Sequence, residues 1–173
     1  TVAQLLAVDS RLDRDRVRSA MIAAGGSVND ASGSYIRLNS GKAVVSLLPD
    51  LVPSGRSFLG GSTDALALAY TLPLYAGPVD LYVAIDTPAG SFCLLPSGQW
   101  SDPVHSGYVP FVQTYSRANA AAGPLFGEGG AFPAISLAGF PAGRYVWRAA
   151  AVNATTGKLV GAIVESPLQI ELR

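Results

Sequence analysis

The residues best suited to acid–base chemistry lie between positions 101 and 106. This stretch reads Ser-Asp-Pro-Val-His-Ser and contains His105, the only histidine among the 173 residues. Asp102 and His105, with Ser101 or Ser106, are the residue types of a nucleophilic triad, in which a carboxylate orients an imidazole that activates a hydroxyl. The sequence has no Gly-x-Ser-x-Gly elbow to present such a serine. We therefore expect His105 to lie in a surface loop and the protein not to be an enzyme.

Carboxylates and the single cysteine give no stronger signal for catalysis or metal binding. Asp80 and Asp86 lie on one face of a predicted strand, but six residues of strand separate them by about 20 Å, too far for a glycosidase pair. Cys93 is the only cysteine, which excludes an internal disulfide and a structural zinc site. Four aspartates fall in predicted loops without the spacing of a calcium motif: Asp50, Asp64, Asp86 and Asp102. We expect no metal and no cofactor.

Aromatic residues favour binding over catalysis. The candidates lie in the middle of the chain: Trp100, Tyr108, Phe111 and Tyr115. Exposed rings at these positions would stack on sugar faces or contact a protein partner, and packing in a core accounts for them equally well. Trp147 shares one side of a predicted strand with Tyr145 and is expected in the core. The segment 116–132 contains glycine-rich runs and exceeds an ordinary loop in length, so we predict it as the contact surface.

Composition limits the partners and the compartment. Twelve basic and twelve acidic side chains cancel to a net charge of zero, which argues against nucleic acid as a partner. Hydrophobic types make up 49% of the chain, which predicts a buried core, but no uninterrupted apolar run reaches the roughly 18 residues of a membrane span. The sequence opens at Thr1 without methionine, as a cleaved secretion signal would leave it. We expect an extracellular or cell-surface location.

The first part of the chain predicts a helix and a hairpin. Ser10 and Asp13 form a capping-box-like start, and the glycines at 25–26 form a stop, so a helix is expected between them. Residues 34–38 and 43–48 flank a glycine-containing turn and predict a β-hairpin. The apolar segment before this helix, residues 2–8, extends the helix or forms a strand. We assign residues 1–65 to an N-terminal helical segment and hairpin, and 66–173 to a β-sandwich domain.

The rest of the chain has the two-residue period of strands. Apolar and other residues alternate strictly over 79–86, and the chain ends on a similar alternation over 167–173. Turn clusters separate the segments, and no helical crossovers are found, which favours an all-β sandwich or barrel over a parallel α/β sheet. Strands are expected at about 66–72, 79–86, 91–95, 108–115, 134–138, 144–152, 159–164 and 167–173.

One strand start resembles a known type of module. The run Pro141-Ala142-Gly143-Arg144-Tyr145 resembles the Pro-x-Gly-x-Tyr strand entry of immunoglobulin-like and fibronectin-like β-sandwich modules in secreted bacterial proteins. Residues 79–92 and 155–161 are similar to a strand pair and a hairpin of the same modules. The resemblance implies a mainly β fold, an immunoglobulin-like antiparallel β-sandwich. Such sandwiches serve as spacers, adhesins, filament subunits and carbohydrate-binding domains, so it implies architecture rather than chemistry.

These observations predict a non-enzymatic extracellular structural or interaction protein. We expect a subunit of a surface or filamentous, pilus-like assembly whose partners are other protein chains, including copies of itself. Its low net charge and the edges of its terminal strands would favour pairing with neighbours. The expected assembly residues are Val2, Leu5, Leu6, Val8, Leu168, Ile170 and Leu172. The alternative is a carbohydrate- or ligand-binding accessory module that uses Trp100 and Tyr108.

Overall fold

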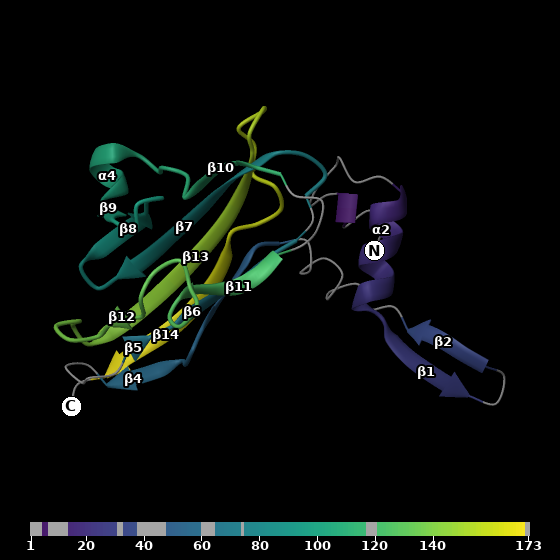
Figure 1. Ribbon diagram of the computed structural model, residues 1–173, viewed down its shortest axis with the longest axis horizontal. Coiled ribbons are helices and arrows are strands. Elements are labelled where there is room, and N and C mark those ends of the chain that lie inside the picture. The colour runs from purple at the N-terminus through teal and green to yellow at the C-terminus, as the bar shows by residue number, and fades with distance from the viewer. Residues whose placement is uncertain are drawn as a thin grey trace.

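The protein is mainly β, with several antiparallel sheets (Figure 1). The computed structural model describes residues 5–6, 14–30, 33–37, 48–59, 65–73, 75–116 and 121–171. Within these ranges, no helix is long and apolar enough to cross a membrane. The strands and antiparallel sheets confirm the predicted mainly β class.

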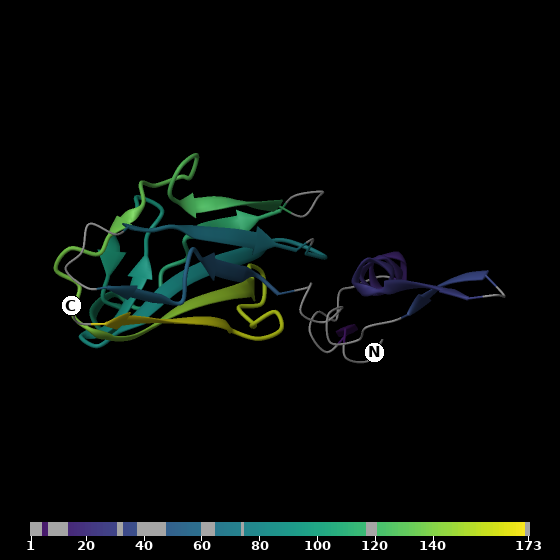
Figure 2. The ribbon, with the colours of Figure 1, turned by 90° about the horizontal axis from the view of Figure 1, so that it is seen from below.

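The N-terminal helix and hairpin project to one side of the larger sheets (Figures 1 and 2). Helix α2 (Arg14–Ala24) ends beside the predicted glycine stop, while the predicted start at Ser10 lies outside the described residues. Strands β1 (Gly26–Asp30) and β2 (Gly33–Arg37) pair antiparallel. The predicted strand at 34–38 is thus present but pairs with the segment before it, because β1 is close enough in sequence for a tight hairpin. Most of its predicted partner, 43–48, lies outside the described residues.

A large sheet positions most residues of interest. Its strands are β4 (Ser57–Leu59), β7 (Val79–Thr87), β8 (Gly90–Leu94), β9 (Trp100–Ser101), β10 (Val112–Tyr115), β13 (Gly143–Asn153) and β14 (Val164–Glu171). The order is β4-β14-β13-β7-β8-β9, and β10 also pairs with β7. Every pairing is antiparallel except that of β4 with β14. Because β13 is paired on both sides, the register around Trp147 is fixed, with Ile85 and Ser166 opposite it.

Smaller sheets cover the inner face of the large sheet (Figure 2). Their strands are β3 (Asp50–Pro53), β5 (Ala65–Leu66), β6 (Leu68–Leu72), β11 (Ala121–Phe126) and β12 (Ile135–Ser136). β6 pairs with β11 and β3, and β5 pairs with β12. Although β3 and β4 precede residue 65, they pair with β6 and β14. These two strands therefore belong to the sheets formed by the later part of the chain.

The core lies between the facing sheets. Val79, Leu81, Val83 and Ile85 are all buried on β7, as the predicted alternation requires. Tyr145, Trp147 and Ala149 are buried on β13, and Leu168 and Ile170 on β14. Burial of one large apolar side chain contributes about 1.5–3 kcal/mol. The two-residue period places these apolar side chains on one face of each strand, and their burial stabilises the fold.

The strand entry at 141–145 shows why its residue types are needed. Gly143 has φ 149°, and a Cβ on it would lie 2.5 Å from Pro88 Cγ. Both the conformation and the space therefore favour glycine. Two residues later, the buried Tyr145 hydroxyl donates to the Pro141 carbonyl at 2.7 Å. Burial raises the pKa of Tyr145, which keeps the hydroxyl protonated as a donor.

Three predicted segments differ from the structure. The segment 116–132 was predicted as a loop but contains β11, which has a Gly-Pro pair inside it. The prolines and the glycine of segment 49–56 are typical of turns, yet this segment contains β3. The segment 159–164 was predicted as a strand, yet Leu159 forms only an isolated bridge with Val152, and β14 begins at Val164. A partner distant in sequence, β6, decides the first two cases, and local residue types do not reveal it.

Candidate functional site

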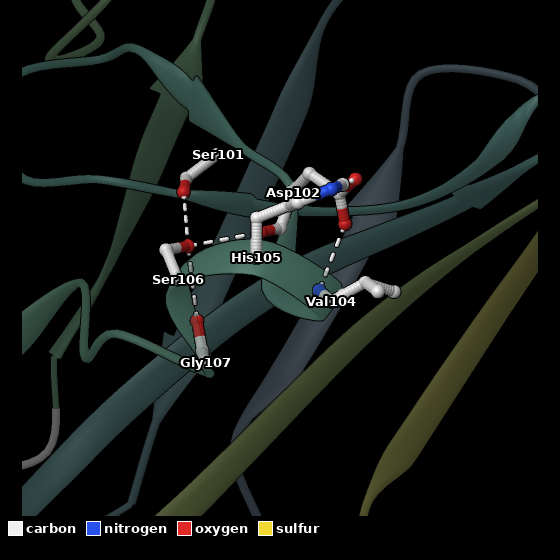
Figure 3. A network of polar contacts seen from close by, with 6 residues as sticks. All are labelled: Ser101, Asp102, Val104, His105, Ser106 and Gly107. Atoms are coloured by element: carbon white, nitrogen blue, oxygen red, sulfur yellow. Dashed lines mark hydrogen bonds and ion pairs between the residues drawn. The ribbon is translucent and has the colours of Figure 1, made fainter.

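The Asp102–His105 pair closes one turn of helix. Helix α4 (Pro103–Ser106) begins after Asp102, whose Oδ1 accepts a hydrogen bond from the Val104 backbone N–H at 2.8 Å. Asp102 Oδ2 lies 2.8 Å from His105 Nδ1 (Figure 3). The Val104 N–H, and then the hydrogen bond with His105, hold the pKa of Asp102 below that of an ordinary aspartate. Asp102 is thus an N-cap residue that also holds the imidazole.

The two serines beside this pair contact each other, and Ser106 also bonds to the backbone. Ser106 Oγ donates to the Asp102 carbonyl at 2.9 Å and lies 2.6 Å from Ser101 Oγ (Figure 3). A triad instead requires a hydrogen bond between the imidazole and the nucleophilic hydroxyl. The His105 side chain is 83% exposed, so it lies at the surface as predicted, although in a short helix rather than a loop. The hydrogen bonds of Asp102 and Ser106 therefore stabilise the single turn of α4.

The candidate carboxylates have local structural partners. Asp80 Oδ1 accepts from the Thr114 N–H at 2.8 Å, and Asp50 Oδ1 accepts from its neighbour Leu51 at 2.9 Å. Asp86 accepts from Ser91 Oγ at 2.6 Å and also faces an arginine. Asp64 lies outside the described residues. Among the residues that the structure describes, no three His, Cys, Asp or Glu side chains gather as a metal site requires.

Cys93 lies in the core on β8, with 1% of its surface exposed. Burial raises the pKa of the Cys93 thiol, which keeps it protonated and unreactive at neutral pH. Cys93 therefore acts as a small hydrophobic residue of the core.

The four predicted binding aromatics do not form one surface. Trp100 lines a cavity of about 320 Å³ on the inner face of the large sheet, here called the Trp147 cavity. Phe111 and Tyr115 line a second inner cavity of about 240 Å³. Tyr108 lines a groove of about 320 Å³ on the opposite, outer face of β7 and β13, here called the Tyr108 groove. Trp100 and Tyr108 are therefore separated by the sheet, and a sugar could not stack on both.

Three of these four aromatics take part in internal packing. Trp100 stacks on Phe126, with ring centroids 6.3 Å apart and planes within 8°. Tyr115 packs edge-on against the ring of Tyr75, with ring centroids 6.2 Å apart. Phe111 packs against the core. Trp100 keeps 39% of its surface exposed, whereas Tyr108 is 63% exposed. Tyr108 is therefore the aromatic most available to a partner.

The Tyr108 groove gathers exposed apolar side chains that the sequence did not single out. Leu159 and Ile163, from the connection between β13 and β14, are 46% and 50% exposed. Arg148 lines the groove, and its Nη2 lies 2.8 Å from Asp86 Oδ2 and 3.2 Å from Glu165 Oε1. The groove thus combines apolar side chains with a paired cation. The only signal in the sequence was the presence of large apolar residues in a glycine-punctuated stretch.

The predicted assembly residues are placed as follows. Leu168 and Ile170 point into the core, and β14 is flanked by β13 and β4. This part of the last strand does not form the free edge that the assembly prediction used. Leu5 is fully buried against α2, whereas Leu6 is 38% exposed. Three others lie outside the described residues: Val2, Val8 and Leu172.

No protein-family model matches this sequence, and no curated protein shows significant similarity to it. The functional proposal therefore rests on the geometry of the sites described above.

Proposed function

We propose that this chain is a non-enzymatic interaction protein, extracellular or at the cell surface, that assembles with copies of itself through the Tyr108 groove. The observation that carries the proposal is the gathering of Tyr108, Leu159 and Ile163, each large, apolar and exposed, around one groove. Single exposed apolar residues are ordinary on a protein surface, but a contiguous group marks an interaction site.

The finer fold belongs to the same proposal: the sheets form an immunoglobulin-like sandwich. In support, β3 pairs in a small sheet while β4, a few residues later, pairs parallel with β14 in the large sheet. A hydrogen bond from a tyrosine near the start of a central strand to a carbonyl upstream is a hallmark of such sandwiches. Tyr145 and Pro141 form this bond.

The chemistry of the groove suits a protein partner. Tyrosine and arginine are enriched where proteins meet, because each combines a large contact area with a polar end. Tyr108 and Arg148 supply these types in the lining of the groove. Burial, and then the nearby charge of Asp80, raise the pKa of Tyr82 in the same groove, so its hydroxyl stays neutral. A net charge of zero leaves little repulsion between copies.

Light scattering after size exclusion, over a range of concentrations, tests this proposal. We expect the wild-type chain to assemble as its concentration rises, and Tyr108→Ser combined with Ile163→Ser to remain monomeric. Val52→Ser is the matched control, because Val52 is 51% exposed on β3, outside the groove. A wild-type monomer at every concentration would contradict self-assembly. Equal loss in the control would contradict the groove as the contact.

A further inference from the structure

The Trp147 cavity has the size of a small-molecule site. Its walls come from β7, β8, β9, β13 and β14 of the large sheet and from β5 and β12, which cover it. Its volume of about 320 Å³ lies at the lower end of the range for ligand pockets, roughly 300–1,000 Å³. Exposed residues stand at its rim: Ala89, Gly139 and Pro141. The cavity is therefore accessible from one end of the facing sheets.

Most polar side chains around the cavity already have hydrogen-bond partners within the protein. The Thr87 hydroxyl donates to the Gly90 carbonyl at 2.9 Å and accepts from the Ala89 N–H at 3.1 Å. The Tyr145 hydroxyl donates to Pro141. No acidic or basic side chain lines the cavity within the described part of the chain. A charged ligand, or a sugar with many hydroxyls, would thus be buried without hydrogen-bond partners, which is strongly unfavourable.

One donor in the cavity wall has no acceptor. Trp147 is fully buried, and its Nε1 has no hydrogen-bond partner among the described residues. An indole N–H can only donate, and a buried donor without an acceptor is destabilising. Such groups are rare in native proteins and call for an explanation, of which a bound ligand is one. A ligand in this otherwise apolar cavity could supply the acceptor that Trp147 Nε1 lacks.

We propose that the Trp147 cavity binds a small, neutral, apolar molecule with one carbonyl or ether oxygen, which accepts a hydrogen bond from Trp147 Nε1. The apolar body fills the space lined by residues such as Ile85, Leu137 and Ile170, and the oxygen satisfies the orphan donor. This site is independent of self-assembly, because the Tyr108 groove lies on the opposite face of β13.

The indole N–H signals of the full chain test the proposal by NMR. The chain has two tryptophans, Trp100 and Trp147, so two such signals are expected, and Trp147→Phe assigns them by removing one. The probes are 2-heptanone, heptane and heptanoate. We expect 2-heptanone to move the Trp147 proton downfield as it gains an acceptor, heptane to bind without that shift, and heptanoate not to bind. No response to 2-heptanone, or the same downfield shift with heptane, would overturn the proposal.

Variants separate the hydrogen bond from the cavity itself. Trp147→Phe keeps a ring but removes the donor, and should weaken 2-heptanone binding about tenfold relative to heptane, in line with the loss of one buried hydrogen bond. Trp100→Phe is the matched control and should leave the relative affinity for the two probes unchanged. Equal weakening of both probes in Trp147→Phe contradicts the role of Nε1. Ala89→Leu, at the exposed rim, blocks entry without changing the core and should abolish binding of both; unchanged binding contradicts this location.

Discussion

The two faces of strand β13 differ in exposure and in charge. On the inner face, Tyr145, Trp147 and Ala149 are buried, and Trp147 presents a donor without a partner. On the outer face, Arg148 is half-exposed and lies within ion-pair distance of two carboxylates. Residues one position apart in sequence therefore meet opposite environments, because side chains alternate across a strand.

This difference would let one strand support both proposed kinds of binding. Water reaches the outer face, so charge is tolerated there and a protein surface can dock against mixed apolar and polar groups. The inner face is apolar, so a ligand there must be uncharged and nearly free of hydroxyls. If the comparison is correct, substitutions on the inner face should affect stability far more than those on the outer face.

The largest effect is expected from Trp147→Ala. Removing this fully buried side chain enlarges an existing cavity and should lower the free energy of unfolding by about 3–5 kcal/mol. Chemical denaturation followed by circular dichroism measures it. A loss no greater than that of the outer-face substitution described below would break the comparison.

Tyr145→Phe should have an intermediate effect. The ring remains in the core, but the hydrogen bond to the carbonyl of the exposed Pro141 is lost, and a typical net hydrogen bond contributes about 0.5–1.5 kcal/mol. The same denaturation experiment measures the change. An unchanged free energy of unfolding would mean that water replaces the hydroxyl and that the strand entry does not depend on this bond.

On the outer face, Arg148→Met should change little. Its partners Asp86 and Glu165 are partly exposed, and ion pairs of this kind contribute about 0–1 kcal/mol. We expect the difference between wild type and variant to shrink further in high salt, because solvent ions screen exposed charges. A loss of stability that is large and independent of salt would show that this face behaves like the core.

The smallest effect concerns pH and is confined to helix α4. Because the folded-state pKa of Asp102 is lowered, its stabilising contribution is present above the pKa of an unfolded aspartate, about 4, and is lost as pH falls through the lower folded value. NMR should show the Val104 amide signal moving in that acidic range while the β13 amides stay unchanged. Asp102→Asn should remove the transition. A midpoint above that of an ordinary aspartate would contradict the capping role.

The sequence predicted strands well where the alternation was strong. β7 follows the apolar period closely, and both β7 and β13 were found near the expected residues. β11 was missed because its Gly-Pro pair is typical of a turn, and it is held as a strand by β6 across more than 45 intervening residues. Long-range pairing of this kind leaves no local pattern.

The candidate sites were less predictable for the same reason. Asp102 and His105 are close in sequence, but the sequence placed His105 in a loop, and the turn of helix that brings the two side chains together is seen only in the structure. The Trp147 cavity depends on β5 and β12, which are two residues each and are placed only by their mutual pairing. Likewise, the sequence could not separate Trp100 from Tyr108, which required the position of the whole sheet.

The placement of the tryptophans has an optical consequence. Both line the same cavity, with ring centroids 5.7 Å apart, and neither lies in the first 99 residues. Tryptophan emission from this chain therefore reports on a single neighbourhood inside the sheets. Helix α2 and the β1–β2 hairpin contain no tryptophan, so their melting would go unseen by that emission.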